Sequence, residues 1–427
     1  MNIVSTILSL ALIVFGLAPG FGFAGGGGSS SGGGGGYSGG SSYHSSDSSL
    51  SSDDDPIITL IAVVVIVIAI VASAVMSKKQ IKAKMEKNNS TPEEKYIHEE
   101  AERIFKAYQA DWSNMAPVQI AAYTTPDYYN HASYQLELLS NLHRVNRVSN
   151  LKVNYVALLN PVDSNTPLPA TVRVEFGFSG LDEVIDTAKS KTLYKNNAAS
   201  VTETWNFIYD GKSLKLAGIS QPTESAPHLI KSLAEFASTN HLYYSPDWGR
   251  YAIPSRGLIF GGHTMTNSDI NNHIIGKWAL RSAKAKDPNT KPDLLVQLYT
   301  YAATPGDPST YYLVGQINVP KDYLGVIVKS KKYKNRLKPD RSYDKFEMEW
   351  PDFNKRYEVY ASSRDALPAF ELLNPKFMEY LYDKNLNYNL EVADNVIYIF
   401  APVRQVTEAD YAELLDVLKL AHKELKM

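Results

Sequence analysis

The chain has 427 residues and 44% hydrophobic content, enough for two domains that each bury a core. It contains no cysteine, which excludes disulfides, thiolate metal sites and a cysteine nucleophile. A formal net charge of -2 provides no global field that would attract nucleic acid, so no nucleic-acid partner is expected.

Residues 1–24 combine an apolar centre with a helix breaker at Pro19 and small residues at Gly22 and Ala24. This pattern is typical of a signal peptide that is cleaved after Ala24. Because a basic n-region is missing, an uncleaved first helix is the alternative. Residues 25–55 are nearly all Gly, Ser and Asp and have too little apolar surface to offset the entropy of ordering. They are expected to form a disordered segment on the outer face of a membrane.

Residues 56–77 are expected to form a transmembrane helix, because the uncharged run from Ile57 to Met76 spans roughly 30 Å as a helix. A basic juxtamembrane linker, residues 78–90, follows directly. A lysine excess at a membrane exit is retained on the cytoplasmic side, so residues 91–427 are expected in the cytoplasm. The same lysines are candidate contacts for anionic lipid, at about 1 kcal/mol each. They are Lys78, Lys79, Lys82, Lys84 and Lys87.

The next segment, residues 91–222, indicates helices followed by strands. Thr91 and Glu94 form a capping box at a helix start, and a second helix is expected from Pro126. Apolar residues then alternate with period two along 172–178 and 201–207, which predicts an antiparallel meander. Residues 180–197, between these strands, indicate an elaborated connection. The fold class is therefore α+β.

A second α+β domain of unknown function is expected over residues 240–427. Its apolar patterns predict strands, a long helix, a hairpin and a terminal helix capped at Thr407. The expected ranges are strands around 294–303, 311–320 and 323–329, the helix through 366–383, and the hairpin through 387–402.

Several stretches between residues 95 and 222 resemble the Tim forty-four-like domain family. They are "IFKAYQADW" at 104–112, "YTTPDYY" at 123–129, and "VTETWNFIY" and "LKLAGISQP" between 201 and 222. The resemblance implies a nuclear-transport-factor-two-like cone, in which a curved antiparallel sheet wraps a long helix and can leave an apolar pocket. It also implies a bacterial, membrane-anchored protein. The pattern "DFNKRYEVYASSRDALPAFELLNPKFMEYL" at 352–381 resembles an uncharacterised bacterial domain that names no chemistry.

An aromatic set in the first domain is the candidate wall of a pocket for a hydrophobic ligand, although core packing is the simpler interpretation of each member. The set is Trp112, Tyr123, Phe176, Phe178, Trp205 and Phe207. Glu203 shares a strand face with Trp205 and is a candidate base, whereas Glu175 lies in the opposite phase to Phe176. A paired acid and base is therefore not expected, and a structural Glu203 is favoured over a catalytic one.

The histidines have no metal-ligand spacing, so no metal site and no cofactor are expected. The basic tract at 329–341 is interpreted as a solvated loop, with anionic lipid or a nucleic-acid backbone as the alternative partner.

These features together indicate a single-pass protein of a bacterial cell membrane, with its Gly/Ser segment outside. It is expected to be a binding or tethering protein and not an enzyme, recruiting a hydrophobic peptide segment, a partner such as another membrane or translocated protein, or lipid. The alternatives are a small-molecule enzyme with a buried carboxylate in the cone, and a structural envelope protein.

The lysine linker makes the topology testable. A reporter fused after Met427 is expected to be active only if it works in the cytoplasm, and changing the five linker lysines to Glu should destabilise this orientation. Activity of an exported-only reporter at the same position would contradict the predicted topology.

Overall fold

The computed structural model describes residues 91–424, with gaps at 164, 221–229, 247–249, 255–256, 261–268, 279–293, 305–306, 334–337, 340 and 363–372. The predicted signal peptide, Gly/Ser segment, transmembrane helix and lysine linker lie outside the described residues. Within the part that is described, none of the helices combines the length and apolar content needed to cross a bilayer.

Three helices open the first unit, which comprises residues 91–220. They are α3 (Pro92–Ser113), α4 (Pro117–Ile120) and α5 (Pro126–Asn141). The Thr91 side chain accepts a hydrogen bond from the backbone N–H of Glu94 at 3.1 Å, and Thr125 caps α5 in the same way. Both predicted helix starts are confirmed.

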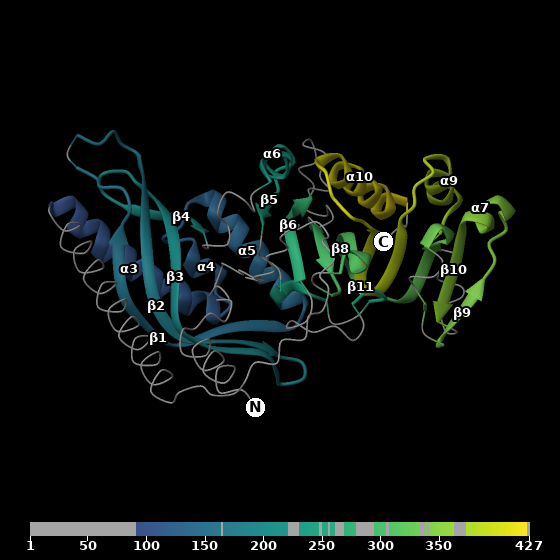
Figure 1. Cartoon of the computed structure of the whole chain (residues 1–427), viewed down its shortest axis with the longest axis horizontal. Coiled ribbons are helices and arrows are strands. Elements are labelled where there is room, and N and C mark those ends of the chain that lie inside the picture. The colour runs from purple at the N-terminus through teal and green to yellow at the C-terminus, as the bar shows by residue number, and fades with distance from the viewer. Residues whose placement is uncertain are drawn as a thin grey trace, which may run out of the picture.

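A four-stranded antiparallel sheet completes the first unit, and α3 lies along it (Figure 1). Its strands are β1 (Arg144–Leu158), β2 (Ala170–Asp186), β3 (Lys191–Tyr209) and β4 (Leu214–Ser220). Phe176 lies opposite Glu203 and Val174 opposite Trp205, so the predicted strand phase is confirmed. The connection expected at 180–197 is wrong, because β2 and β3 continue through it as a paired ribbon that turns at residues 187–190.

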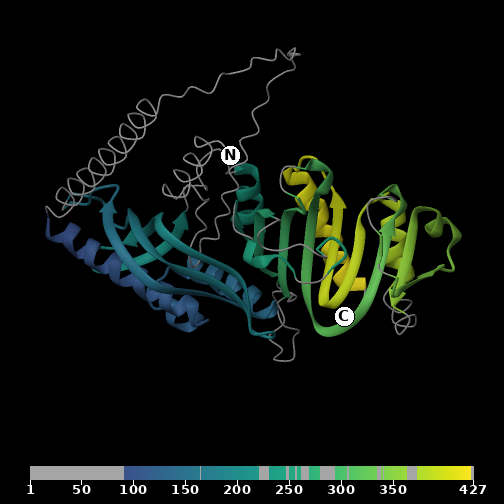
Figure 2. The same cartoon turned by 60° about the horizontal axis from the view of Figure 1, so that its bottom comes forward.

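The second unit, residues 230–424, consists of one larger antiparallel sheet and the helices packed on it. Figure 2 shows this unit beside the first. The sheet order is β5-β6-β7-β8-β10-β9, and β11 pairs with β8. The strands are β5 (Tyr243–Ser245), β6 (Asp269–Trp278), β7 (Leu294–Ala302), β8 (Tyr311–Ser330), β9 (Tyr343–Phe346), β10 (Tyr357–Ser362) and β11 (Asn389–Pro402). The helices are α6 (Lys231–Thr239), α7 (Pro351–Arg356), α9 (Pro375–Asp383) and α10 (Glu408–Glu424), with 3-10 turns η2 (Arg250–Ala252), η3 (Pro308–Thr310) and η4 (Lys331–Tyr333). The predicted α+β class is confirmed.

The larger sheet is covered on both faces. Val296 and Leu298 of β7 join a core cluster that includes residues of α6, α9 and α10, whereas Leu295 and Tyr299 join a cluster that includes Ile253 and Phe260. A strand buried on both faces has little need for polar positions, which explains the nearly continuous apolar sequence of β7.

Two expectations for the second unit are wrong in detail. Residues 311–320 and 323–329 form the single strand β8, and the hairpin expected at 387–402 is the single strand β11. Both halves of β11 pair with β8, from Leu390 opposite Val328 to Pro402 opposite Tyr312. The sequence Ala-Asp-Asn at 393–395 marks a register irregularity and not a turn. The terminal helix expected after Thr407 is confirmed as α10.

The contact between α10 and β8 generates a stability prediction. A Cβ atom on Gly315 would lie 2.6 Å from Leu418 and 3.0 Å from Leu414, both on α10, so Gly315→Ala is expected to destabilise the protein by about 1 to 3 kcal/mol through overpacking. The control is Gly218→Ala, where the nearest atom, on Asn206, is 3.7 Å away. Denaturant unfolding of the two variants measures the difference, and equal losses would contradict this packing.

Candidate functional site

The six predicted aromatic residues lie together in the core of the first unit. All are at most 6% exposed, and Phe105 of α3 packs among them with its ring 4.5 Å from that of Phe176 and 4.9 Å from that of Trp205. The set is Trp112, Tyr123, Phe176, Phe178, Trp205 and Phe207. Their contacts are those of a packed core. A role as the wall of a ligand pocket stays a prediction.

Glu175 and Glu203, the two strand carboxylates singled out from the sequence, point in different directions. Glu203 is fully buried and accepts a hydrogen bond from the Trp205 indole at 3.0 Å. Glu175 accepts one from the Tyr155 hydroxyl at 3.2 Å, on the other face of the sheet. The two groups therefore share no site, in agreement with the phase read from the sequence.

A buried polar network that the sequence did not predict runs from the first unit into the second. The Trp112 indole donates to Asn146 at 3.0 Å, and the Asn146 amide donates to one oxygen of Asp182 at 2.5 Å. The Tyr251 hydroxyl, from η2, donates to the other oxygen at 2.6 Å. Asp182 is fully buried. Its carboxylate thus has donors on both oxygens, one of them from a residue 69 positions further along the chain.

Tyr251 and Leu258 are bonded to different sheets by such groups. The Arg144 side chain of β1 donates a hydrogen bond to the backbone oxygen of Tyr251 at 2.6 Å. Glu391 of β11 accepts a hydrogen bond from the backbone N–H of Leu258 at 2.6 Å. These two residues therefore form a junction between the sheet of the first unit and that of the second.

Both carboxyl groups at this junction are harder to ionise than usual. Burial raises the pKa of Asp182 to about 6, although hydrogen bonds from Tyr251 and Asn146 oppose the shift. Burial likewise raises the pKa of Glu391 to about 7, against the bond from Leu258.

Two further histidines pack against aromatic or polar side chains: His273 is fully buried and His131 is partly buried. The His131 ring stacks on Tyr243 at 5.1 Å, and His273 shares a hydrogen bond with Gln297 at 3.0 Å. Burial, with the charge of His273, lowers the pKa of His131 to about 3, and burial lowers that of His273 to about 4. Both are neutral at pH 7 and fit the interpretation of core histidines.

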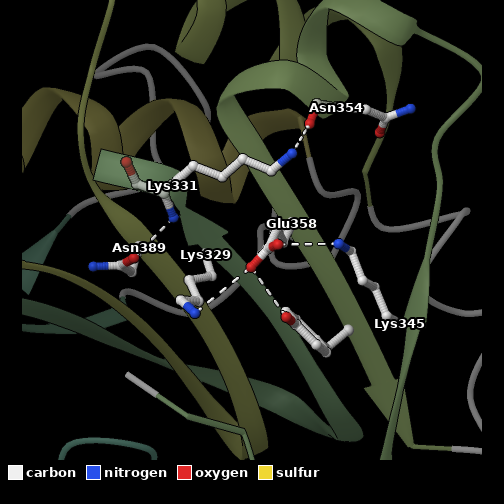
Figure 3. A network of polar contacts seen from close by, with 8 residues as sticks. Lys329, Lys331, Lys345, Asn354, Glu358 and Asn389 are labelled. Atoms are coloured by element: carbon white, nitrogen blue, oxygen red, sulfur yellow. Dashed lines mark hydrogen bonds and ion pairs between the residues drawn. The ribbon is translucent and has the colours of Figure 1, made fainter. Parts of the chain in front are cut away.

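A lysine and glutamate cluster occupies the end of β8 and its neighbours (Figure 3). The Glu358 carboxylate accepts hydrogen bonds from the Lys345 ammonium group and the Tyr360 hydroxyl, each at 3.0 Å. It also forms an ion pair with the Lys329 ammonium group at 3.6 Å. Although burial raises the pKa of Glu358, the Lys345 and Tyr360 hydrogen bonds and the lysine charges lower it overall. Lys331 donates to the backbone oxygen of Asn354 at 2.5 Å. The basic tract at 329–341 therefore begins inside the fold, and the solvated-loop interpretation is wrong for Lys329, whose side chain is 5% exposed.

A groove of about 250 Å³ lies between α6 and α10 on the second unit, and these helices lie close together in Figure 1. Buried Phe236 and Leu415 line it, together with the partly buried Ala412. Its polar lining comprises Thr239, Asn240, Glu408, Asp416 and Lys419. The groove thus combines apolar contacts with two carboxylates and one ammonium group.

Across the described residues, no group of three or more His, Cys, Asp or Glu side chains is placed to hold a metal ion. The lipid-contact candidates Lys78, Lys79, Lys82, Lys84 and Lys87 lie outside the described residues.

One protein family matches part of the second unit. A family described as "Protein of unknown function (DUF3137)" matches residues 312–412, which confirms the resemblance of the C-terminal part to an uncharacterised family. No curated protein sequence matches the chain. Neither the matching family nor the solved structures below belong by name to the Tim forty-four-like family, so that resemblance stays a prediction.

Two solved structures are similar to parts of the chain. One is the mycobacterial trehalose monomycolate transport factor A, TtfA, at 11% identity and a TM-score of 0.30, covering 46% of this chain and 92% of that one. The other is the intermembrane space region of the chloroplast protein ARC6, at 11% identity and a TM-score of 0.23, covering 29% and 95%. Similarity this low carries no argument about function.

One signal in the sequence does point to the buried network. Asp182 follows Phe176 and Phe178 at even spacing on β2, so it occupies an inward-facing position. A carboxylate in the apolar phase of a strand indicates a buried partner. The identity of that partner, Tyr251, is fixed only by the tertiary fold.

Asp182→Asn tests this arrangement through pH. The pKa of Asp182 is 3.8 in the unfolded chain and about 6 in the folded protein. The stability that such a raised pKa contributes is fully present below pH 3.8 and is lost as the pH rises through about 6. Between these limits the wild type should lose about 3 kcal/mol relative to the variant, which has no group to titrate there. Denaturant unfolding of both proteins at several pH values measures the difference, and parallel curves would contradict the raised pKa.

Proposed function

We propose that this chain is a membrane-held binding or tethering protein, and not an enzyme, whose groove between α6 and α10 accepts a short apolar segment of a partner protein. The single observation that supports it most is the groove itself, which Phe236 and Leu415 of the second unit's core line together with polar side chains. Aromatic and aliphatic side chains with a few polar groups around them are typical of peptide anchor sites.

The size of the groove favours a side chain over a whole small molecule. Its volume of about 250 Å³ is below the range of about 300 to 1,000 Å³ typical of small-molecule pockets. The lining carries Glu408 and Asp416 against Lys419, a net charge of about -1. The partner segment is therefore an apolar anchor with basic residues beside it.

The membrane attachment in this proposal comes from the sequence. The uncharged run from Ile57 to Met76 supplies the anchor, and the lysine linker places residues 91–427 on the cytoplasmic side. The resemblance of residues 95–222 to the Tim forty-four-like family, named after a membrane-tethering component of a translocase, supports the same role.

The enzyme alternative draws on the buried carboxylates of the first unit. Glu203 accepts a hydrogen bond from the Trp205 indole, and Asp182 accepts hydrogen bonds from Asn146 and Tyr251. A general base needs a path to a substrate proton, and these hydrogen bonds already occupy the groups within the core. This is why binding is favoured over turnover.

A substitution that fills the groove tests the proposal. Ala412→Trp, in the groove, should weaken binding of an apolar peptide flanked by lysines by about tenfold or more, which is about 1.4 kcal/mol or more. Ala409→Trp, on the exposed side of the same helix and outside the groove lining, is the matched control. Fluorescence anisotropy with the full chain in lipid nanodiscs measures both, alongside a peptide flanked by glutamates. Equal affinities for both variants, or tighter binding of the glutamate peptide, would contradict the proposal.

A further inference from the structure

Three distant segments meet at the end of the first unit where α3 begins (Figure 1). The Tyr96 hydroxyl, in the first turns of α3, donates to the backbone oxygen of Lys212 at 3.0 Å. A Cβ atom on Gly211, next in the β3–β4 turn, would lie 2.7 Å from Leu168 of the β1–β2 loop. Gly211 has a φ of 92°, so glycine suits this turn on conformational grounds as well. We call these three segments the tip: residues 95–96, 167–169 and 210–213.

The tip exposes apolar side chains. Leu168 is 52% exposed and stands between the exposed Pro167 and Pro169, and Tyr96 is 38% exposed. In the described part of the chain four large hydrophobic side chains are exposed, and these are two of them. The others are Val118 and Ile230, in other segments. Exposed apolar groups gathered at one end of a unit mark a contact surface.

The position of the tip along the chain limits its distance from the predicted membrane run. The predicted membrane run ends at Met76 and α3 begins at Pro92, so only residues 77–91 separate the bilayer from the tip. Even fully extended, that stretch reaches no further than about 50 Å. The exposed leucine and tyrosine are thus held within reach of the membrane surface.

We propose that the tip contacts the bilayer, with Leu168 inserted at the boundary between headgroups and acyl chains and Tyr96 at headgroup level. This rests on the membrane anchor of the proposed function. Tyrosine suits that depth because its ring is apolar and its hydroxyl polar.

The tip carries a small net charge of +1, from Lys95 and Lys212 against Asp210. Lys95 and Lys212 are exposed, and the Asp210 carboxylate accepts the backbone N–H groups of Lys212 and Ser213 within its own turn. These hydrogen bonds lower the pKa of Asp210, so it stays ionised. The contact therefore depends on the apolar side chains, and it is expected with neutral as well as anionic lipid.

The absence of cysteine allows a clean test in the full chain. Leu168→Cys carries an environment-sensitive NBD label, and the protein is reconstituted into phosphatidylcholine vesicles with or without phosphatidylglycerol. Val118→Cys is the matched control, because Val118 is 75% exposed and lies just beyond the other end of α3, a helix about 33 Å long. Label emission and its quenching by nitroxide lipids are measured.

The Leu168→Cys label should shift to shorter wavelength and be quenched by shallow nitroxide lipids in both vesicle types, while the Val118→Cys label shows neither effect. Absence of quenching at Leu168→Cys in protein that resists carbonate extraction would overturn the tip contact and leave the anchor in place. Quenching of both labels would overturn it as well, because the contact would not be confined to the tip. Release of the whole chain by carbonate would overturn the anchor, and with it both proposals.

Discussion

The hydrogen bond from Tyr251 to Asp182 is the contact on which the junction of the two units depends. The Tyr251 ring belongs to the core cluster of the first unit, whereas its neighbours Ala252 and Ile253 belong to a cluster of the second. An ionised carboxylate buried without donors is unfavourable by several kcal/mol. Asn146 supplies a donor to one oxygen of Asp182 from within the first unit, and Tyr251 supplies the donor to the other oxygen from beyond it. The hydrogen bonding of this buried carboxylate is therefore completed by a residue that lies outside the first unit's own sheet.

Close aromatic packing in the first unit directs the proposed binding role to the surface. The rings of Phe105, Phe176 and Trp205 pack there with centroids 4.5 to 5.4 Å apart. In the two proposals the groove of α6 and α10 binds a protein segment, and the tip at the start of α3 contacts lipid. These two surfaces belong to different units. Tyr251 and Leu258, which lie seven positions apart, are hydrogen-bonded to the sheets of the first and the second unit respectively.

Local signals explain what the sequence predicted correctly. The Thr91 cap and the period-two phase of Phe176 and Trp205 depend on residues within a few positions, and both agree with the structure. The hairpin expected at 387–402 was wrong because a local turn cue was outweighed by pairing along the whole of β8. The groove could not be predicted at all. Its walls, α6 and α10, are far apart in the chain and meet only through the shared core.

The position of Tyr251 also has a consequence for synthesis on the ribosome. Every other member of the network, from Trp112 to Asp182, emerges before it, and the chain must grow by another 69 residues before Asp182 receives its last donor. At about 5 to 20 residues per second this interval lasts roughly 3 to 14 seconds. During it the nascent first unit carries an incompletely paired acid beside its aromatic core. The hydrogen bonding of Asp182 is therefore completed only after the whole first unit has been synthesised, when Tyr251 has been added to the chain.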